Sequence, residues 1–503
     1  MNIKKSAILN SSAGLISQVV TILFQFIARS VFIKYLGVEL LGLNSTFASI
    51  LNALALAELG FQSAIIYSLY KPIKEENHDE INKIVSVFCY VYRAIGIFFI
   101  VVSFALLPFL QFILKGVVVD TMVYVFFLLQ AASSAFTYFL AYKRTILNAD
   151  QKGYIAKLID LVINVISNLL QIYVMITLHS YSLYLIIRVL QIVISNILVH
   201  VACKKLYPYL KLTKMDMSVF SRIWVDVKNV FVAKIAGYIY DSTDNLVISV
   251  VINTVTVGFF TNYKTITKSL KILTTSMLAP ITPIIGRLLV DDGANEEKEK
   301  TFLMYNHIRY IISLFLVVPC FTLIDNCISI WVGSEFIMSS GVSLLLCLDL
   351  FIHLVHGGCC DYINGAGLFR QEKQIEIVGA IINLVLSVAL CTQFGVVGIL
   401  IGTVLAQFWF WVGRSYVVYK YCFDMGNKEY IRYILECLEY ILVTAVAVLC
   451  STFAYGMLTI DNLVLKFITG GLISIFICAV IYIICYGWRS EFRTMLRIIK
   501  RKS

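Results

Sequence analysis

The sequence predicts an all-α integral membrane protein with about fourteen transmembrane helices. Hydrophobic residues make up 60% of its 503 residues and charged residues 14%, whereas soluble chains contain ~45–50% apolar and ~25% charged residues. The mean hydropathy of +0.86 is therefore too high for a set of soluble domains. The 13 cysteines lack metal-ligand spacing, so we expect them to act as small apolar side chains.

Each predicted span is a mostly apolar stretch of about 20 residues or more, the length that crosses the ~30 Å hydrocarbon core as a helix. The stretches are 10–33, 41–69, 84–107, 117–141, 155–178, 181–202, 229–252, 256–284, 306–328, 341–361, 375–393, 395–419, 431–455 and 463–487. Residues 377–413 carry no charge and are too long for one span, so we expect a helical hairpin that turns at 392–395. The weakest stretch is 306–328, which opens with His307 and Arg309 and contains Pro319 near its far end.

The placement of lysine and arginine predicts the orientation of these spans. Most of the 41 Lys and Arg residues fall in alternate loops on one side, and only Lys34, Lys115 and Lys466 fall in loops on the other. Because positive residues stay on the cytoplasmic side of short loops, we expect both termini in the cytoplasm. The basic residues are spread over every inner loop, which is not typical of a nucleic-acid surface, so no nucleic-acid partner is expected.

Weak internal similarity predicts two six-helix halves around a central cavity, a common design in transporters. Residues 37–44 and 255–262 each lie at a short outer turn, and both halves end in a hairpin with an asparagine, Asn164 or Asn383, in its first arm. The expected domains are an N-terminal half at 1–203, a cytoplasmic linker at 204–228, a C-terminal half at 229–422, and a final helical pair with a basic cytoplasmic tail at 423–503.

The loops argue against an enzyme. The outer loops are short and carry no sizeable set of catalytic carboxylates, and the inner loops contain no P-loop, no G-x-G-x-x-G after a strand and no H-E-x-x-H zinc motif. No catalytic residue, cofactor or metal site is therefore expected. Any chemistry must take place between the helices, which indicates transport.

Three lysines in the eighth predicted span are candidate substrate-binding residues. Lys264, Lys268 and Lys271 are spaced i, i+4 and i+7, which places them on one helix face over ~10 Å. A charge inside the bilayer costs ~2.5–3.5 kcal/mol, so this stripe is expected to face a cavity that attracts an anion. The alternatives are that Asp241 and Asp244 of the preceding span neutralise the stripe, or that Lys271 extends to the inner surface.

Further charged residues lie inside predicted spans. Arg188 is expected to line the cavity, whereas Arg29 either lines the cavity or anchors the first span at the outer interface. A lone carboxylate in mid-span is costly unless it is protonated or paired. Glu58 is therefore a candidate proton or cation site, or else the partner of Arg29. Asp241 and Asp244 are further candidates for ion coupling.

The order of three short stretches carries a resemblance to a known family: FIKYLG at 32–37, AELGF at 57–61 and FGVVGI at 394–399. Over nearly its full length, the chain resembles the polysaccharide transporters of the multidrug/oligosaccharidyl-lipid/polysaccharide exporter superfamily. The resemblance implies a flippase that carries undecaprenyl-diphosphate-linked oligosaccharide from the inner to the outer leaflet of the bacterial cytoplasmic membrane, for capsule, O-antigen or a related surface polysaccharide. Family members have basic cavity residues, and the positions that fit here are Lys264, Lys268, Arg29 and Arg188.

Two other functions stay open. A drug or metabolite cation antiporter of the same superfamily would prefer an acidic cavity, and Glu58, Asp241 and Asp244 favour that function. The third hypothesis is a membrane scaffold that anchors polysaccharide synthesis enzymes without transporting anything. For a flippase, the expected partners are the lipid-linked oligosaccharide, membrane lipid, and a polysaccharide polymerase and glycosyltransferases.

Overall fold

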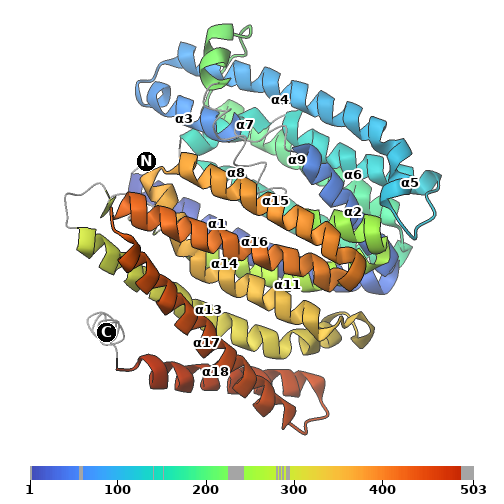
Figure 1. Ribbon diagram of the computed structural model, residues 1–503. Coiled ribbons are helices and arrows are strands. Elements are labelled where there is room, and N and C mark those ends of the chain that lie inside the picture. Colours follow the sequence, from blue (N-terminus) through green and yellow to red (C-terminus); the bar gives the residue numbers. More distant parts are fainter. Residues whose placement is uncertain are drawn as a thin grey trace. The chain divides into compact units, whose positions relative to one another are not determined.

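The computed structural model describes residues 3–55, 61–139, 141–150, 152–224, 243–278, 281, 285, 288–289 and 295–488. Regular structure within these ranges is entirely helical (Figure 1). In the described part of the chain, 11 helices are long and apolar enough to cross a membrane. This confirms the predicted all-α, multi-pass architecture, while the number of fourteen spans stays a prediction.

The chain divides into two compact units, Met1–Thr261 and Asn262–Ser503. The helices of the first unit are α1 (Ile3–Leu36), α2 (Val38–Leu54), α3 (Phe61–Lys74), α4 (His78–Leu106), α5 (Leu110–Ile113), α6 (Thr121–Phe139), α7 (Ala141–Ala149), α8 (Gly153–Leu178) and α9 (Tyr181–Leu206). A short apolar helix, Thr243–Ile252, precedes α11 (Thr254–Leu278), which passes from the first unit into the second.

The second unit continues with six long helices: α13 (Asn295–Trp331), α14 (Ser340–Ala366), α15 (Phe369–Phe394), α16 (Val396–Val417), α17 (Asn427–Gly456) and α18 (Leu463–Tyr486). Shorter 3₁₀ or π-helical turns lie at Leu107–Phe109, Ile248–Ile252, Ser334–Phe336 and Val418–Cys422. The predicted domain boundaries stay a proposal.

The predicted span 41–69 is described in two parts: α2 ends at Leu54 and α3 begins at Phe61. Residues 56–60 lie outside the described residues, so the extent of this span stays a prediction. Most of the predicted span 229–252 also lies outside them. The eighth predicted span corresponds to α11, which is long enough to cross a membrane but is not among the apolar helices counted above, because it is rich in lysine and threonine.

The weakest predicted stretch, 306–328, lies within α13, a helix of 37 residues. Both ring nitrogens of the buried His307 side chain are within hydrogen-bond distance of a tyrosine hydroxyl. Nδ1 lies 3.1 Å from the Tyr440 hydroxyl of α17, and Nε2 lies 2.9 Å from the Tyr482 hydroxyl of α18. Hydroxyls also join the same three helices, through Thr322, Ser451 and Ser474. The C-terminal helical pair is therefore fastened to α13 by polar contacts.

Helices α15 and α16 form the predicted hairpin. Gly395 joins them with φ +58° and ψ −135°, a backbone conformation that other residues rarely adopt. The two arms pack closely, because a Cβ atom at Gly398 would overlap the Leu390 carbonyl and one at Gly402 would lie 2.7 Å from Ser387 Oγ. Small residues at such crossings let transmembrane helices approach each other.

Buried polar side chains inside the hairpin bond to groups of the opposite arm. The Asn383 side-chain amide donates to Thr403 Oγ1 at 3.0 Å, and the Ser387 hydroxyl donates to the Ile399 carbonyl at 3.1 Å. Asn383 and Ser387 are fully buried. An unpaired polar group at such positions would be costly, so these bonds stabilise the pairing of the arms.

The segment that follows α9 is fastened to the start of α4. The Asn82 amide donates to the Tyr209 carbonyl at 3.2 Å, its Oδ1 accepts from the Lys211 N–H at 3.0 Å, and the Thr213 N–H donates to Ser86 Oγ at 2.8 Å. Burial, together with a hydrogen bond to a nearby carboxylate, raises the pKa of Tyr207 at the end of α9, so its hydroxyl stays a donor. The first part of the predicted linker is thus an ordered part of the first unit.

We predict that Gly398→Ala destabilises the protein by ~1–3 kcal/mol, the usual cost of overpacking. The added methyl group meets backbone of the opposite arm, which cannot move away without opening the hairpin. Gly456→Ala is the matched control, since its Cβ would meet nothing within 4 Å. Thermal unfolding midpoints of the two purified variants should differ, and equal midpoints would contradict the close packing described here.

Candidate functional site

The lysine stripe predicted from the sequence lies on α11, inside its second-unit part. Lys268 is exposed and makes no ion pair with any residue in the described ranges, whereas Lys264 is half-buried. Lys271 is half-buried too, and its ammonium lies 2.6 Å from Asp349 Oδ2 of α14. The partners expected from the sequence were Asp241 and Asp244 for the stripe, or the inner surface for Lys271. The structure instead gives Lys271 a counter-ion on another helix of its own unit.

Asp349 connects three helices of the second unit. Its side chain is only 8% exposed, and its second carboxylate oxygen accepts a hydrogen bond from the Gln407 amide of α16 at 3.1 Å. A carboxylate at this depth would be costly without such partners. The Lys271 charge is therefore balanced in this structure, whereas Lys268 has no ion pair among the described residues.

The candidate residue Arg29 lies on α1 in the first unit. Its Nη2 donates to Thr261 Oγ1 at 2.6 Å, and the same hydroxyl lies 3.4 Å from Ser45 Oγ on α2. The helices meet closely here, since a Cβ atom on Gly42 would overlap the Thr254 carbonyl. Glu58, the alternative partner of Arg29, lies outside the described residues, so that pairing stays a prediction.

The other candidate residues of the first unit are more dispersed. Arg188 is half-buried on α9, two turns beyond Tyr181, whose hydroxyl donates to Asn44 Oδ1 at 3.1 Å. Asp244 is buried in the short helix before α11, next to Asn245, whose amide donates to a serine hydroxyl of α2. Asp241 lies outside the described residues. The roles proposed for these residues in cargo binding and ion coupling stay predictions.

A bidentate ion pair that the sequence analysis missed joins α7 to α8. Arg144 donates to both carboxylate oxygens of Asp160 at 2.6 and 2.9 Å, and its Nε donates to the Asn196 side chain on α9 at 3.1 Å. Ser195 completes the cluster with a short hydrogen bond to the same carboxylate. The available signal was Asp160 itself, because a carboxylate inside a predicted span needs a cation within reach.

A second missed ion pair lies between α13 and α14. Arg309 is buried, and its Nη1 lies 3.0 Å from Asp361 Oδ2 while its Nε donates to the Leu354 carbonyl at 2.9 Å. Gly357 makes the space for this guanidinium, since a Cβ atom there would overlap it. Arg309, the charge that weakened the prediction of 306–328 as a span, is therefore neutralised by Asp361 of α14.

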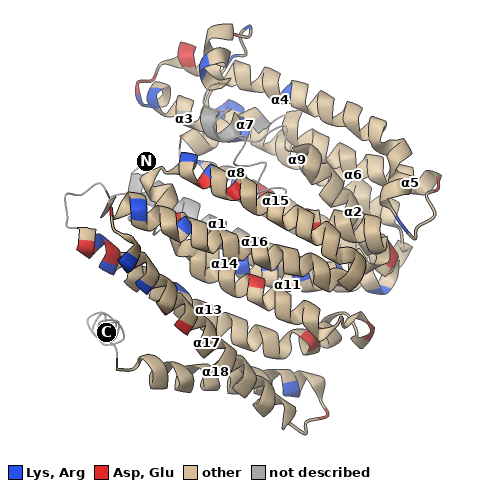
Figure 2. Cartoon of the chain, in the orientation of Figure 1, with Lys and Arg blue, Asp and Glu red and all other residues tan. Residues whose placement is uncertain are grey.

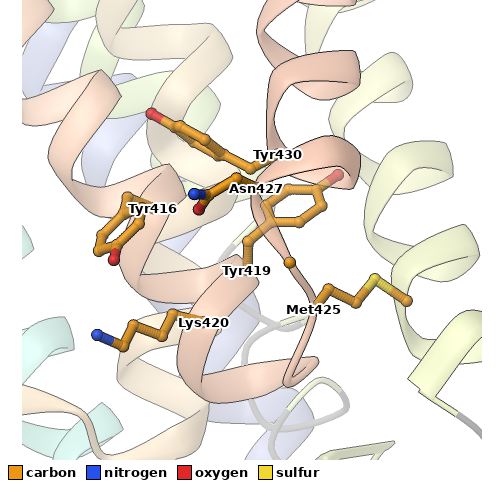
Figure 3. Close-up of a pocket in the computed structure, with 7 residues that line it drawn as sticks. Tyr416, Tyr419, Lys420, Met425, Asn427 and Tyr430 are labelled. Atoms are coloured by element: carbon orange, nitrogen blue, oxygen red, sulfur yellow. The ribbon is translucent and has the colours of Figure 1, made fainter.

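A small cavity lies where α16 ends and α17 begins. Its volume is ≈ 150 Å³, and its lining includes Tyr416, Lys420, Asn427 and Tyr430 (Figure 3). Pockets for drug-sized ligands usually measure ~300–1,000 Å³, so this cavity is too small for a lipid-linked oligosaccharide. Among the described residues, no group of three or more His, Cys, Asp or Glu side chains is placed to hold a metal ion.

Charged residues are sparse along most of the long helices (Figure 2). No protein-family model matches the chain. The structure is similar to the lipid II flippase MurJ in an inward closed conformation, with a TM-score of 0.71 and 15% identity over 95% of this chain and 99% of that one. It is also similar to an inward-facing multidrug resistance MATE family transporter of the MOP superfamily, with a TM-score of 0.63 and 16% identity over 80% of this chain and 94% of that one. The chain has the fold of MOP-superfamily transporters.

One curated protein is similar to part of this chain in sequence. The chain is 28% identical over 182 residues to the "Probable low-salt glycan biosynthesis flippase Agl15" of Haloferax volcanii. The alignment covers 35% of this chain and 37% of that protein, little more than a third of either. The protein from Haloferax volcanii is named as a probable flippase, and the two solved structures are a flippase and a multidrug transporter.

We predict that Asp349→Asn destabilises this MOP fold by ~3–5 kcal/mol, because it leaves the Lys271 ammonium without a counter-ion. The double variant Lys271→Met/Asp349→Leu should recover much of that loss, since it removes both charges. Asp461→Asn, at an exposed site between α17 and α18, is the control. Thermal unfolding in lipid nanodiscs measures the three variants, and equal midpoints for Asp349→Asn and Asp461→Asn would show that the pair contributes nothing.

Proposed function

We propose that this protein is a flippase that moves undecaprenyl-diphosphate-linked oligosaccharide from the inner to the outer leaflet, for capsule, O-antigen or a related surface polysaccharide. The observation that carries the proposal is the lysine stripe of α11 in a MOP fold, with Lys268 exposed and Lys271 held by Asp349. The similarity to a protein named as a glycan biosynthesis flippase supports the same cargo class.

The chemistry of the cargo suits these side chains. A diphosphate carries about two negative charges, and lysine is a flexible point charge that can follow a moving phosphate without a fixed bidentate geometry. Lys264 and Lys268 bind the diphosphate, Arg29 and Arg188 add positive charge from the first unit, and the polyprenyl tail stays in lipid. Lys271 joins them if cargo competes with Asp349 for its ammonium.

Alternating access moves the cargo in this proposal. The two halves rock between inward-open and outward-open states around the central cavity, and both termini lie in the cytoplasm of a bacterial cell whose cytoplasmic membrane holds the protein. A polysaccharide polymerase and glycosyltransferases are the proposed partners, because they would produce and consume the lipid-linked cargo.

A cation antiporter is the second candidate, favoured by the similarity to MATE-family multidrug transporters and by the buried Asp244. The sign of the charge on α11 weighs against it, because the exposed Lys268 would repel a cationic drug. Uptake of a cationic dye into vesicles that is competed by drugs, without any requirement for Lys268, would favour the antiporter.

We predict that Lys264→Ala and Lys268→Ala each greatly reduce surface polysaccharide at near-normal protein abundance. Loss of one charged contact to the diphosphate should weaken binding by about tenfold or more, and Lys268→Arg should restore part of the function. Lys428→Ala, at an exposed position in the first turn of α17, is the matched control. The measurement is immunoblotting of surface polysaccharide, normalised to the transporter. Recovery of function in Lys268→Ala/Asp241→Asn would instead mean that Lys268 only neutralises an acid.

We predict that the segment after α9 faces the cytoplasm and the turn between α8 and α9 faces outward, as the basic residues indicate. The test places a single cysteine near Lys211 or near Ser180 in a background from which the 13 native cysteines have been removed. A membrane-impermeant thiol reagent added to intact cells should label only the site near Ser180. The reverse pattern would invert the proposed topology.

A further inference from the structure

Two carboxylates share one guanidinium in the second unit, outside the lysine stripe. Arg414, near the end of α16, places its Nη2 3.0 Å from Glu372 Oε1 and 3.2 Å from Glu376 Oε1. The two glutamates are one turn apart on α15 and so lie on the same helix face. The Nη1 atom of Arg414 lies 3.1 Å from Nε2 of His356 on α14. Three helices thus meet at one positive charge.

The imidazole of this cluster is neutral. His356 is almost fully buried, and its Nδ1 lies 2.7 Å from the Ile352 carbonyl. A carbonyl only accepts hydrogen bonds, so Nδ1 carries the ring proton and Nε2 accepts from Arg414. A second proton on Nε2 would point at the guanidinium donors, so the histidine does not supply a balancing charge.

The remaining charges do not balance if both glutamates are ionised. Arg414 and Glu372 are 12% exposed and Glu376 is 16% exposed, so the cluster is largely shielded from water. Within the described part of the chain, neither glutamate has an ion pair with a second cation. Arg309 on α13 is paired with Asp361. The other titratable groups near the cluster are Cys359, Cys360 and His353, all on α14. Two neighbouring carboxylates in such a setting favour the form in which one of them is protonated.

The cluster is connected to the lysine stripe through the same two helices. On α14, Asp349 and His356 are seven residues apart, and on α16, Gln407 and Arg414 are also seven residues apart. Residues at this spacing share a helix face at a separation of ~10 Å. A change in the charge of the Arg414 cluster that moves α16 against α14 therefore also alters the contacts around Asp349, which pairs with Lys271.

We propose that Glu372 and Glu376 together bind one exchangeable proton, and that its binding and release drive the transport cycle. This proposal rests on the transport function proposed above. The pair takes its proton from water on the outer side and releases it to water on the inner side, while the anionic cargo moves outward. An inside-negative membrane potential favours both movements, because a positive charge moves inward and a negative charge moves outward.

The first test asks whether the proton is present, without any cargo. Infrared spectra of the full-length protein in nanodiscs, recorded from mildly acidic to mildly alkaline pH, should contain a protonated-carboxyl band that titrates and shifts in D₂O. Glu376→Gln and Glu372→Gln should each lose this band, because the carboxylate left behind pairs with Arg414 alone. Glu297→Gln, at an exposed position in the first turn of α13, should keep it. Absence of a titrating band from the wild-type protein would overturn the proposal, and this result needs no variant to fold.

The second test asks whether the proton is coupled to transport. Proteoliposomes with a trapped pH-sensitive dye receive a polyprenyl-diphosphate-linked sugar, and proton movement is recorded with cargo movement. Wild type and Glu297→Gln should move both, whereas Glu376→Gln should lose cargo-dependent proton movement. Unchanged dependence of Glu376→Gln on an imposed pH gradient would overturn the proposal and leave the flippase function intact. No cargo movement by the wild type would overturn the flippase function, while the infrared titration still decides whether the proton site exists.

Discussion

Charge in hydrocarbon is the constraint on which the rest of this structure depends. A buried ion is tolerated when a partner and hydrogen bonds satisfy it, and removing one partner is far more costly than removing both. The described helices meet this constraint with ion pairs that each join two helices: Arg144–Asp160, Lys271–Asp349, Arg309–Asp361 and Arg414–Glu376. Because lipid gives helices no hydrophobic reason to associate, these pairs also help to determine which helices lie together.

The same constraint separates charges that hold helices from charges that are open to a ligand. Arg309 has its hydrogen bonds taken up by Asp361, a tyrosine hydroxyl and a backbone carbonyl, so it is a structural residue. Lys268 is exposed on the same helix that carries the paired Lys271. In a protein with so few charges along its helices, an exposed cation beside a paired one is the feature that most favours an anionic cargo.

The sequence predicted the all-α, multi-pass architecture because hydrophobicity adds up along the chain, and a long apolar helix can be recognised without knowledge of its neighbours. The hairpin at Gly395 and the lysine stripe follow from the same one-dimensional pattern. The partners of the stripe could not be predicted from that pattern. Asp349 and Gln407 become neighbours of Lys271 only through the packing of α11, α14 and α16. The stretch 306–328 was undervalued for a related reason: the charge and imidazole that made it look polar are satisfied by other helices.

The hairpin of α15 and α16 also has a consequence for how the chain enters the membrane during synthesis. The α15 arm alone would bring the unsatisfied Asn383 amide into the bilayer, at a cost of several kcal/mol by transfer from water to hydrocarbon. When the arms enter together, Asn383 already bonds to Thr403, and Ser387 already bonds to the opposite backbone. The tight turn at Gly395 keeps the arms close enough for this to happen. Inserting the two helices together as a hairpin therefore costs less free energy than inserting them one at a time.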